Sequence, residues 1–313
     1  MLRLAISLAF FGLLFYLMRD HIPEILRTLR NVDRRLFVIS VCIFLFTIAV
    51  LAKRLQLIFA AEDLTLPFAE SVNLTFVGYF FNNFLPTSVG GDIVKAMCAS
   101  RITKQTMKSV TSVLMDRIFG LFTFILIPSV SIVFLKDLNP AVPVIVYSFL
   151  IASVFFFFLV FNRGIARRLR FIETLLGRFR LDEKVRRVYD GMHNFKNHKR
   201  VVAEAMLLSI VGQSISILVL YILAIAIGAR TSPIYFYLLV PIVHLISMLP
   251  SLNGFGIREG AYVFLLKPYI GEPAAAAIGI LWLVLLLILS VIGGVVYLMR
   301  QDYHPRLGEP AIG

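Results

Sequence analysis

The stretch Leu85–Asp92 reads LPTSVGGD, and a looser copy of it, Leu249–Glu259, reads LPSLNGFGIRE. Each copy starts with Leu-Pro, continues through glycines to charged residues, and lies inside an apolar region. Broken helix and charge are tolerated at membrane depth only where they are buried in protein or line a polar cavity. Two such breaks in the two halves of one chain are typical of transporters built from repeats. The motif pair therefore favours movement of a molecule across a membrane.

The composition agrees with a membrane location, because the 313 residues are 59% hydrophobic and only 16% charged. Soluble domains carry about 25% charged residues, so the chain is expected to be an all-α, polytopic membrane protein. Two apolar regions, Phe68–Ser100 and Ile234–Leu266, contain the motif copies. Six further apolar stretches, of roughly 17–25 residues, can each span the hydrocarbon core. They are Leu2–Met18, interpreted as a retained first helix, and Leu36–Ala52, Val110–Leu135, Ala141–Phe161, Val201–Gly228 and Ala274–Met299.

The net charge of +13 is concentrated in residues 162–200, which hold twelve Lys and Arg against four acids. The positive-inside rule places this segment in the cytoplasm and explains the charge without a nucleic-acid partner. Four of its apolar residues recur at helical spacing, which predicts an amphipathic helix resting on anionic lipid headgroups. A dedicated lipid or protein docking site is the alternative. These four residues are Ile165, Leu169, Ile172 and Leu176.

The basic segment also orients the other spans. With residues 162–200 inside, region Phe68–Ser100 enters and leaves the membrane from the cytoplasm, and region Ile234–Leu266 does so from outside. The expected architecture is one domain over residues 1–300, with two inverted-topology halves, 1–161 and 201–300, around a cytoplasmic linker. It has about six full spans, two re-entrant hairpins and a cytoplasmic tail over 301–313. Residues 19–35 depart from the rule, because they place five positive charges outside.

The first break gathers residue types that suit a binding site for a polar group: Asn82, Asn83, Pro86, Gly90, Gly91 and Asp92. A helix that ends near Phe84 and another that starts near Gly91 would direct their ends at each other across the loop. Helix N-termini favour anions, and glycines let a ligand approach the backbone. Asp92 is either a helix cap or dipole partner, or a carboxylate that binds a proton or cation.

The second break holds a similar set: Pro250, Asn253, Gly254, Gly256, Arg258 and Glu259. The planar guanidinium of Arg258 suits phosphate, which it can bind through two parallel hydrogen bonds. The alternative is an ion pair from Arg258 to Asp92 or Asp116 that holds the two halves together. Glu259 is expected either to carry a proton or to pair with Arg117.

Asp116 and Arg117 lie a turn or two into the predicted helix Val110–Leu135. Neighbouring residues on a helix point about 100° apart, so one of the two is expected to face a cavity and the other a neighbouring helix. A structural pair near the cytoplasmic interface is the alternative. The chain has no Walker loop and no zinc-ligand spacing, so no cofactor and no metal is expected.

Taken together, these motifs resemble a known family. The matching residues are Asn82–Pro86 (NNFLP), Gly90-Gly91-Asp92 with Lys95, Asp116-Arg117, and Leu249-Pro250 followed by Gly254–Gly260 (GFGIREG). This combination is similar to the lysylphosphatidylglycerol synthase transmembrane region family, a flippase-like group, over nearly the whole chain. Members resemble the flippase half of the multiple peptide resistance factor, which moves aminoacylated phosphatidylglycerol to the outer leaflet. Related short members occur in archaeal glycolipid, hopanoid and exopolysaccharide contexts.

The resemblance implies lipid translocation in a bacterial or archaeal cytoplasmic membrane. Two departures from the family are the lack of the soluble aminoacyl-transfer domain and the Pro86-Thr87 pair, where Pro-Gly is common. Arg117 and Arg258 are expected to hold a lipid phosphate, with Asp92 and Glu259 balancing charge or binding a coupling proton or cation. The backbone N–H groups of Gly90, Gly91, Gly254 and Gly256 are expected to add donors. The alternatives are a membrane-embedded lipid-phosphate enzyme and a non-transporting partner of a lipid-modifying synthase; a homo-oligomer is also compatible with the sequence.

Overall fold

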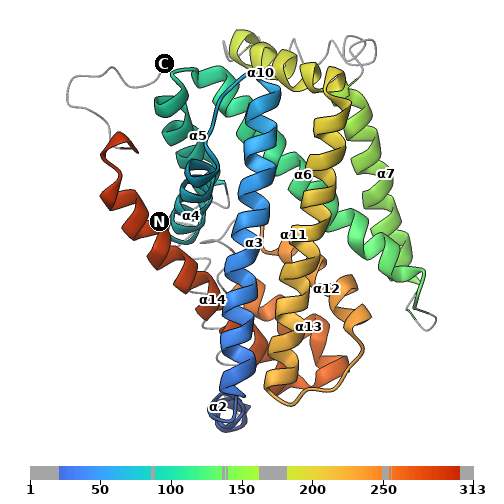
Figure 1. Cartoon of the computed structure of the whole chain (residues 1–313). Coiled ribbons are helices and arrows are strands. Elements are labelled where there is room, and N and C mark those ends of the chain that lie inside the picture. The colour runs from blue at the N-terminus through green and yellow to red at the C-terminus, as the bar shows by residue number, and fades with distance from the viewer. Residues whose placement is uncertain are drawn as a thin grey trace.

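The computed structural model describes residues 21–85, 89–135, 138, 140–161, 182–248, 254 and 256–303. Over these residues the chain is a bundle of helices without a strand (Figure 1). Five helices are long and apolar enough to cross a membrane, which confirms the all-α, multi-span fold and five of the six predicted spans. The sixth, Leu2–Met18, lies outside the described residues. The five are α3 (Arg34–Ala61), α6 (Thr106–Ile132), α7 (Ala141–Phe161), α11 (Lys199–Ala226) and α14 (Glu272–Met299).

The first predicted break separates α4 (Phe68–Phe84) from α5 (Gly90–Thr103). Leu85, the residue after α4, is extended, with ψ at 142°. The ring of a following proline disfavours the helical conformation in its neighbour, which explains why the helix ends here. Pro86 itself lies outside the described residues.

The second predicted break separates α12 (Pro233–Ile246) from α13 (Ile257–Ile270). Gly256 directly precedes α13 with a φ of +81°, a conformation that a residue with a Cβ rarely adopts. Pro250 and Asn253 lie outside the described residues. Both breaks therefore occur where the motif copies predict them.

Each pair of short helices forms a hairpin, and the two hairpins start and finish at opposite ends of the bundle (Figure 1). The α4–α5 hairpin connects the end of α3 to the start of α6. These two helix ends are joined where Lys108 Nζ donates to the carbonyl oxygen of Glu62 at 2.9 Å. The α12–α13 hairpin connects the end of α11 to the start of α14. At that end, the N–H of Asp33 before α3 donates to the carbonyl of Ala226 at 2.9 Å.

The hairpins pack closely on the long helices. A Cβ at Gly293 of α14 would lie 2.1 Å from the carbonyl oxygen of Phe76 in α4, so these two helices meet backbone to backbone. α14 also contacts α3, where Trp282 of α14 packs on Phe44 with ring centroids 4.7 Å apart. The largest group of buried apolar residues joins α3, α11, α12, α13 and α14. This core leaves the α4–α5 hairpin beside α3 and α6, where the polar site lies.

Three short elements complete the described chain. α10 (Asp182–Asn194) and the 3₁₀ turn η2 (Phe195–Asn197) belong to the basic segment and pack on α6 through Phe195, which is fully buried. The predicted amphipathic stretch that begins at Ile165 lies outside the described residues. η3 (Gln301–Tyr303) follows α14, and its Tyr303 is buried against α4 and α5. The expected tail is therefore packed on the bundle as far as residue 303.

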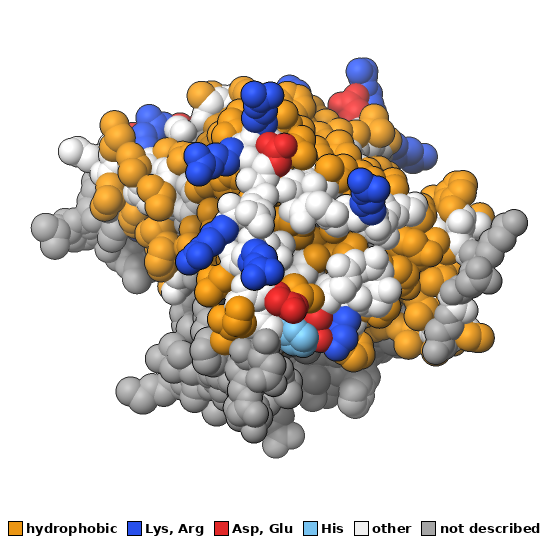
Figure 2. Space-filling model, turned by 90° about the horizontal axis from the view of Figure 1, so that it is seen from below, with side chains coloured by type: hydrophobic (Ala, Val, Ile, Leu, Met, Phe, Trp, Pro, Cys, Tyr) orange, Lys and Arg blue, Asp and Glu red, His pale blue; other side chains and the backbone are white. Residues whose placement is uncertain are grey.

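The end of the bundle that includes α2 (Ile22–Arg30) carries several arginines. Figure 2 shows this end, with Lys and Arg side chains spread over the face among hydrophobic and uncharged ones. Arg27, Arg30, Arg34 and Arg35 are all exposed. They are four of the five positive charges that depart from the positive-inside rule in the predicted orientation, and the fifth, Arg19, lies outside the described residues.

Candidate functional site

A polar pocket of about 220 Å³ lies between the α4–α5 hairpin and helices α3 and α6. α11 and the residue Met248 after α12 complete its wall. Charged and hydrogen-bonding side chains from five helices, α3, α4, α5, α6 and α11, line it. They are Arg54, Tyr79, Asn82, Asp92, Lys95, Asp116, Arg117 and Gln213.

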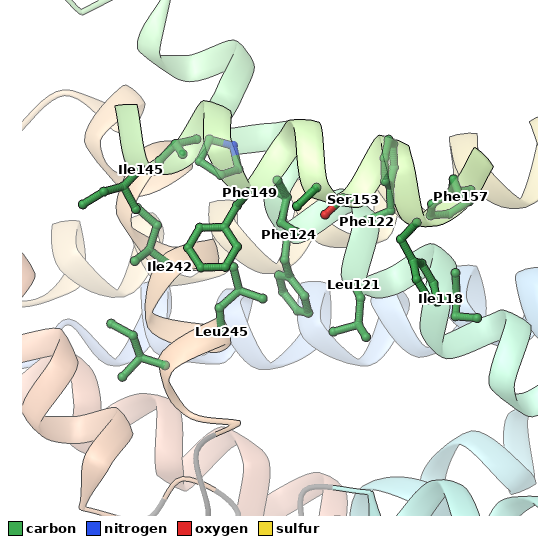
Figure 3. Close-up of a pocket in the computed structure, with 16 residues that line it drawn as sticks. Ile118, Leu121, Phe122, Phe124, Ile145, Phe149, Ser153, Phe157, Ile242 and Leu245 are labelled. Carbon is green, nitrogen blue, oxygen red and sulfur yellow. The ribbon is translucent and has the colours of Figure 1, made fainter. Parts of the chain in front are cut away.

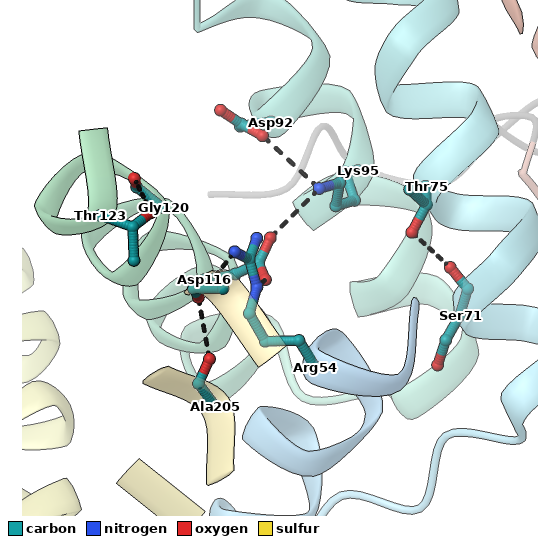
Figure 4. Close-up of polar contacts among 10 residues, drawn as sticks. Arg54, Ser71, Thr75, Asp92, Lys95, Asp116, Gly120, Thr123 and Ala205 are labelled. Carbon is teal, nitrogen blue, oxygen red and sulfur yellow. Dashed lines mark hydrogen bonds and ion pairs between the residues drawn. The ribbon is translucent and has the colours of Figure 1, made fainter. Parts of the chain in front are cut away.

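The charged side chains of the pocket form a continuous chain of ion pairs, and Figure 4 shows the part of it from Arg54 to Asp92. Arg54 Nε lies 2.7 Å from Asp116 Oδ1, and Lys95 Nζ lies 3.5 Å from Asp116 Oδ2. Lys95 Nζ is also 3.6 Å from Asp92 Oδ1, and Asp92 pairs in turn with Arg117. This row of five charges joins α3, α5 and α6.

The row carries an excess of positive charge, because three cations face two carboxylates, for a net charge of +1. Arg54, Lys95 and Asp116 are each less than 10% exposed. Unbalanced charge out of water is costly, so the pocket favours an anion that would neutralise it. With a helical rise of about 1.5 Å per residue, the charges lie roughly 10 to 17 Å from the end of the bundle that includes the ends of α3 and α5.

Four of the residues singled out from the sequence meet in this pocket: Asn82, Asp92, Asp116 and Arg117. Asp116 and Arg117 do not pair with each other; both face the pocket, and each pairs with a residue from another helix. Asp92 lies in the first turn of α5, but no side chain caps that helix, and its carboxylate serves as an ion-pair partner. Asn83 is turned away from the pocket, because its amide donates to the Leu286 carbonyl of α14 at 3.2 Å.

The motif residues of the second break form a separate buried cluster. Arg258 is paired with its neighbour, at 2.7 Å from Nη2 to Glu259 Oε1, and both residues are less than 10% exposed. The expected alternative, an ion pair from Arg258 to Asp92 or Asp116, is therefore wrong. The start of α13 packs on α14, where a Cβ at Gly279 would lie 3.5 Å from Glu259 Cα.

The same distances correct the expected partner of Glu259. Arg117 pairs with Asp92 of the first hairpin, and Glu259 pairs with Arg258. Glu259 also accepts a hydrogen bond from the N–H of Gly256 at 2.7 Å. The carboxylate therefore holds the start of α13 in place.

The motif glycines were expected to offer backbone N–H donors to a ligand, but two of these N–H groups already bond within the protein. The N–H of Gly91 donates to Asn82 Oδ1 at 2.9 Å, and that of Gly256 is engaged by Glu259, so neither group is available to a ligand in this conformation. A Cβ at Gly91 would lie 2.1 Å from the carbonyl oxygen of Gly78, so this glycine lets α4 and α5 touch. Gly254 similarly meets Ser247, and Gly90 is the buried first residue of α5.

Sequence reasoning missed Arg54 as part of the site and did not give Lys95 a binding role. Arg54 also donates to Ser209 Oγ of α11 at 2.9 Å, so it connects Asp116 of α6 to the second half of the chain. The stem of Lys95 passes Gly78, where a Cβ would lie 2.9 Å from its Cε. Gly78 therefore makes room for the lysine to reach both carboxylates.

Comparisons with known proteins support the resemblance seen in the motifs. No curated protein and no solved structure matches the chain. A sequence model of one family, described as the lysylphosphatidylglycerol synthase TM region, matches residues 1–294. This match covers both hairpins, four of the five long helices and α14 as far as residue 294. The chain therefore belongs to the lysylphosphatidylglycerol synthase transmembrane-region family.

Proposed function

We propose that the protein is a lipid transporter that moves a phosphate-containing lipid between the leaflets of a bacterial or archaeal cytoplasmic membrane. The observation that carries this proposal is the net charge of +1 in the buried polar pocket. A phosphodiester carries one negative charge and would neutralise it. Arginine is well suited to phosphate because its guanidinium can donate two parallel hydrogen bonds.

Arg117 is the residue that we assign to the phosphate. Its side chain is 21% exposed, more than those of Arg54 and Lys95, and it lines the pocket. In the present structure its charge is neutralised by Asp92. A lipid phosphate would compete with Asp92 for Arg117, so binding is an exchange of one anionic partner for another. Asp92 is then the group that could take up a proton or coupling cation.

The two hairpins supply a route for alternating exposure of the headgroup. They enter the bundle from opposite ends, and we propose that each re-enters the membrane from its own side. Arg258 and Glu259 lie about 18 Å from the end of the bundle where α13 finishes, by helical rise. The two charged clusters would thus both lie deep in the bilayer, and Arg258 and Glu259 would form the second polar site for the headgroup. The C-terminus would be cytoplasmic, on the same side as the basic segment.

The proposal is tested by lipid movement in proteoliposomes that contain the purified protein. A fluorescent phosphatidylglycerol reports exchange between leaflets, and a fluorescent glycolipid without phosphate serves as the headgroup control. Arg117→Gln should slow movement of the phospholipid roughly tenfold or more, as expected for loss of a charge-assisted hydrogen bond. Arg200→Gln is the matched control, because the Arg200 side chain is 91% exposed and its ion-pair partner among the described residues is Glu204 in the next turn.

The expected result is that the wild-type protein and Arg200→Gln move the phospholipid between leaflets, whereas Arg117→Gln does not. Equal rates for the wild-type protein and Arg117→Gln would refute the assignment of Arg117. Absence of movement of every lipid, with and without a proton or sodium gradient, would refute transport itself.

A further inference from the structure

A second cavity, of about 720 Å³, lies between α6, α7 and α12 (Figure 3). Sixteen residues line it, and Ser153 is the only one with a polar side chain. The volume is within the range of roughly 300 to 1,000 Å³ that ligand pockets occupy in proteins. We refer to this cavity as the α6–α7–α12 groove. Its chemistry suits hydrocarbon and excludes a charged headgroup.

The groove opens on the side of the bundle formed by α7. Ile145, Phe149 and Phe156 of α7 line the groove, yet they are 55%, 58% and 48% exposed. Only 6% of residues Ala141–Phe158 of α7 are buried inside the bundle, so in a membrane this helix faces lipid. A hydrocarbon chain could therefore enter between α7 and its neighbours without crossing a polar layer.

The groove adjoins the polar pocket, and the two cavities share part of one wall. Leu121 and Phe124 of α6 line both cavities. They follow Arg117 at four and seven residues, so the three side chains share one face of α6. Along that face the wall changes from a cation that faces the pocket to apolar side chains that face the groove. This order matches the order of groups in a lipid, from phosphate to hydrocarbon.

We propose that the α6–α7–α12 groove binds a hydrocarbon chain of the same lipid molecule whose phosphate lies at Arg117. The pocket and the groove then form one amphipathic site, with Leu121 and Phe124 at the boundary between headgroup and chain. This inference rests on the proposed function and names its substrate class: a lipid that carries a phosphate headgroup and a long hydrocarbon chain in one molecule. The groove holds that chain while the headgroup is in the pocket.

The test is photolabelling of the protein in nanodiscs with a phosphatidic acid that carries a diazirine in one acyl chain. Labelled positions are mapped by mass spectrometry, and a diacylglycerol with the same diazirine chain reports labelling by any lipid without phosphate. The inference expects labels on α6, α7 and α12 from the phosphatidic acid. Unlabelled phosphatidic acid should compete with them, and Arg117→Gln should reduce them about tenfold, in line with the lost affinity.

Two variants fill the groove from α7, Ser153→Trp and the smaller change Ala152→Phe. Both should reduce photolabelling, and both should reduce the amount of phosphatidic acid that the protein retains in native mass spectrometry. Ile151→Trp is the matched control, because Ile151 is 70% exposed on the same helix and does not line the groove. This control should leave labelling and retention unchanged.

The outcomes separate this inference from the proposed function. If filling the groove leaves retention unchanged while Arg117→Gln weakens it, the chain site is wrong and the headgroup site stands. If the diacylglycerol labels the groove equally and Arg117→Gln has no effect on either probe, bulk lipid occupies the groove and the inference is overturned. If the wild-type protein does not retain phosphatidic acid at all, the proposed headgroup site and the inference both fail.

Discussion

Asp116 lies between two cations and pairs with both: it is the carboxylate that pairs with Arg54, and it shares Lys95 with Asp92. Its carboxylate accepts a hydrogen bond from Arg54 Nε at 2.7 Å and lies 3.5 Å from Lys95 Nζ, and the residue is 5% exposed. Removing one partner from a buried ion pair leaves the other charge uncompensated. The individual charges of the pocket therefore differ in their structural importance, and Asp116 is central.

Asp116→Ala is accordingly expected to destabilise the protein by roughly 3 to 5 kcal/mol, because Arg54 and Lys95 would lose their shared buried partner. Glu204→Ala is the control, since it breaks the Arg200–Glu204 pair, which is exposed to solvent and contributes little to stability. Thermal unfolding in detergent measures both variants. Equal losses of thermal stability would show that the pocket charges are solvated and not mutually dependent.

Glu62, just after α3, is a buried carboxyl with a different role. Burial raises the pKa of Glu62 above its ordinary value of 4.5, although the nearby Lys108 opposes this change. Among the described residues, no donor reaches its Oε1. Because folding favours the protonated form, this carboxyl lowers stability as pH rises from 4.5 through its raised pKa.

Glu62→Gln should therefore raise the melting temperature at pH 7 and above and reduce the loss of stability on going from pH 4.5 to neutral pH. Glu24→Gln is the control, because the Glu24 side chain is 64% exposed. A pH series of melting temperatures tests this expectation. A lower melting temperature for Glu62→Gln at neutral pH would mean that the charged carboxylate stabilises the fold.

The sequence predicted the residues of the pocket unevenly. Asp92, Asp116 and Arg117 stood out because charge inside an apolar stretch is rare. Arg54 was missed because it lies beyond the predicted span, Leu36–Ala52, and so outside the expected membrane depth. The apolar run that continues to Ala61 was the available signal, since it places Arg54 inside α3.

At the scale of helices, glycines determine how closely the hairpins approach their neighbours. Gly293 and Gly279 are both in α14, but they face different surroundings. A Cβ at Gly293 would lie 2.1 Å from backbone of α4, whereas a Cβ at Gly279 would have its nearest contact at an ordinary 3.5 Å, with Glu259. Only the first position requires the absence of a side chain.

Gly293→Ala should destabilise the protein by about 1 to 3 kcal/mol, because α4 and α14 must move apart. Gly279→Ala should be neutral or stabilising by up to about 1 kcal/mol, because alanine favours helix. Melting temperatures of the two variants test the difference. Equal stability would mean that α4 and α14 are not in backbone contact.

The position of both breaks was predictable, since a proline favours an extended residue before it and a glycine permits positive φ. The pairing of charges was not. Arg258 and Glu259 are adjacent in sequence, and neighbours on a helix do not normally face each other. Their contact depends on how α13 packs against α14, which no local pattern encodes.

At the scale of the whole molecule, alternating exposure of the headgroup requires the two hairpins to enter the membrane from opposite sides. Gln105, between α5 and α6, and Arg230, between α11 and α12, are both exposed at opposite ends of the bundle. The basic segment predicts which end is cytoplasmic. The exposed arginines around α2 are at the other end.

Single cysteines at these two positions test the topology. In a background without Cys42 and Cys98, Gln105→Cys should react with a membrane-impermeant maleimide only after the cells are opened. Arg230→Cys should react in intact cells. Reaction of both cysteines from the same side would contradict the inverted arrangement.

The central claim is that the excess positive charge of the polar pocket binds a lipid phosphate, and equilibrium retention of phosphatidic acid in native mass spectrometry measures this directly. Asp92 and the phosphate compete for Arg117, so the account predicts opposite effects at the two residues. Arg117→Gln should weaken retention about tenfold, and Asp92→Asn, if it unfolds at the wild-type temperature, should strengthen it. Weaker retention in both variants, or no change in either, would contradict the claim.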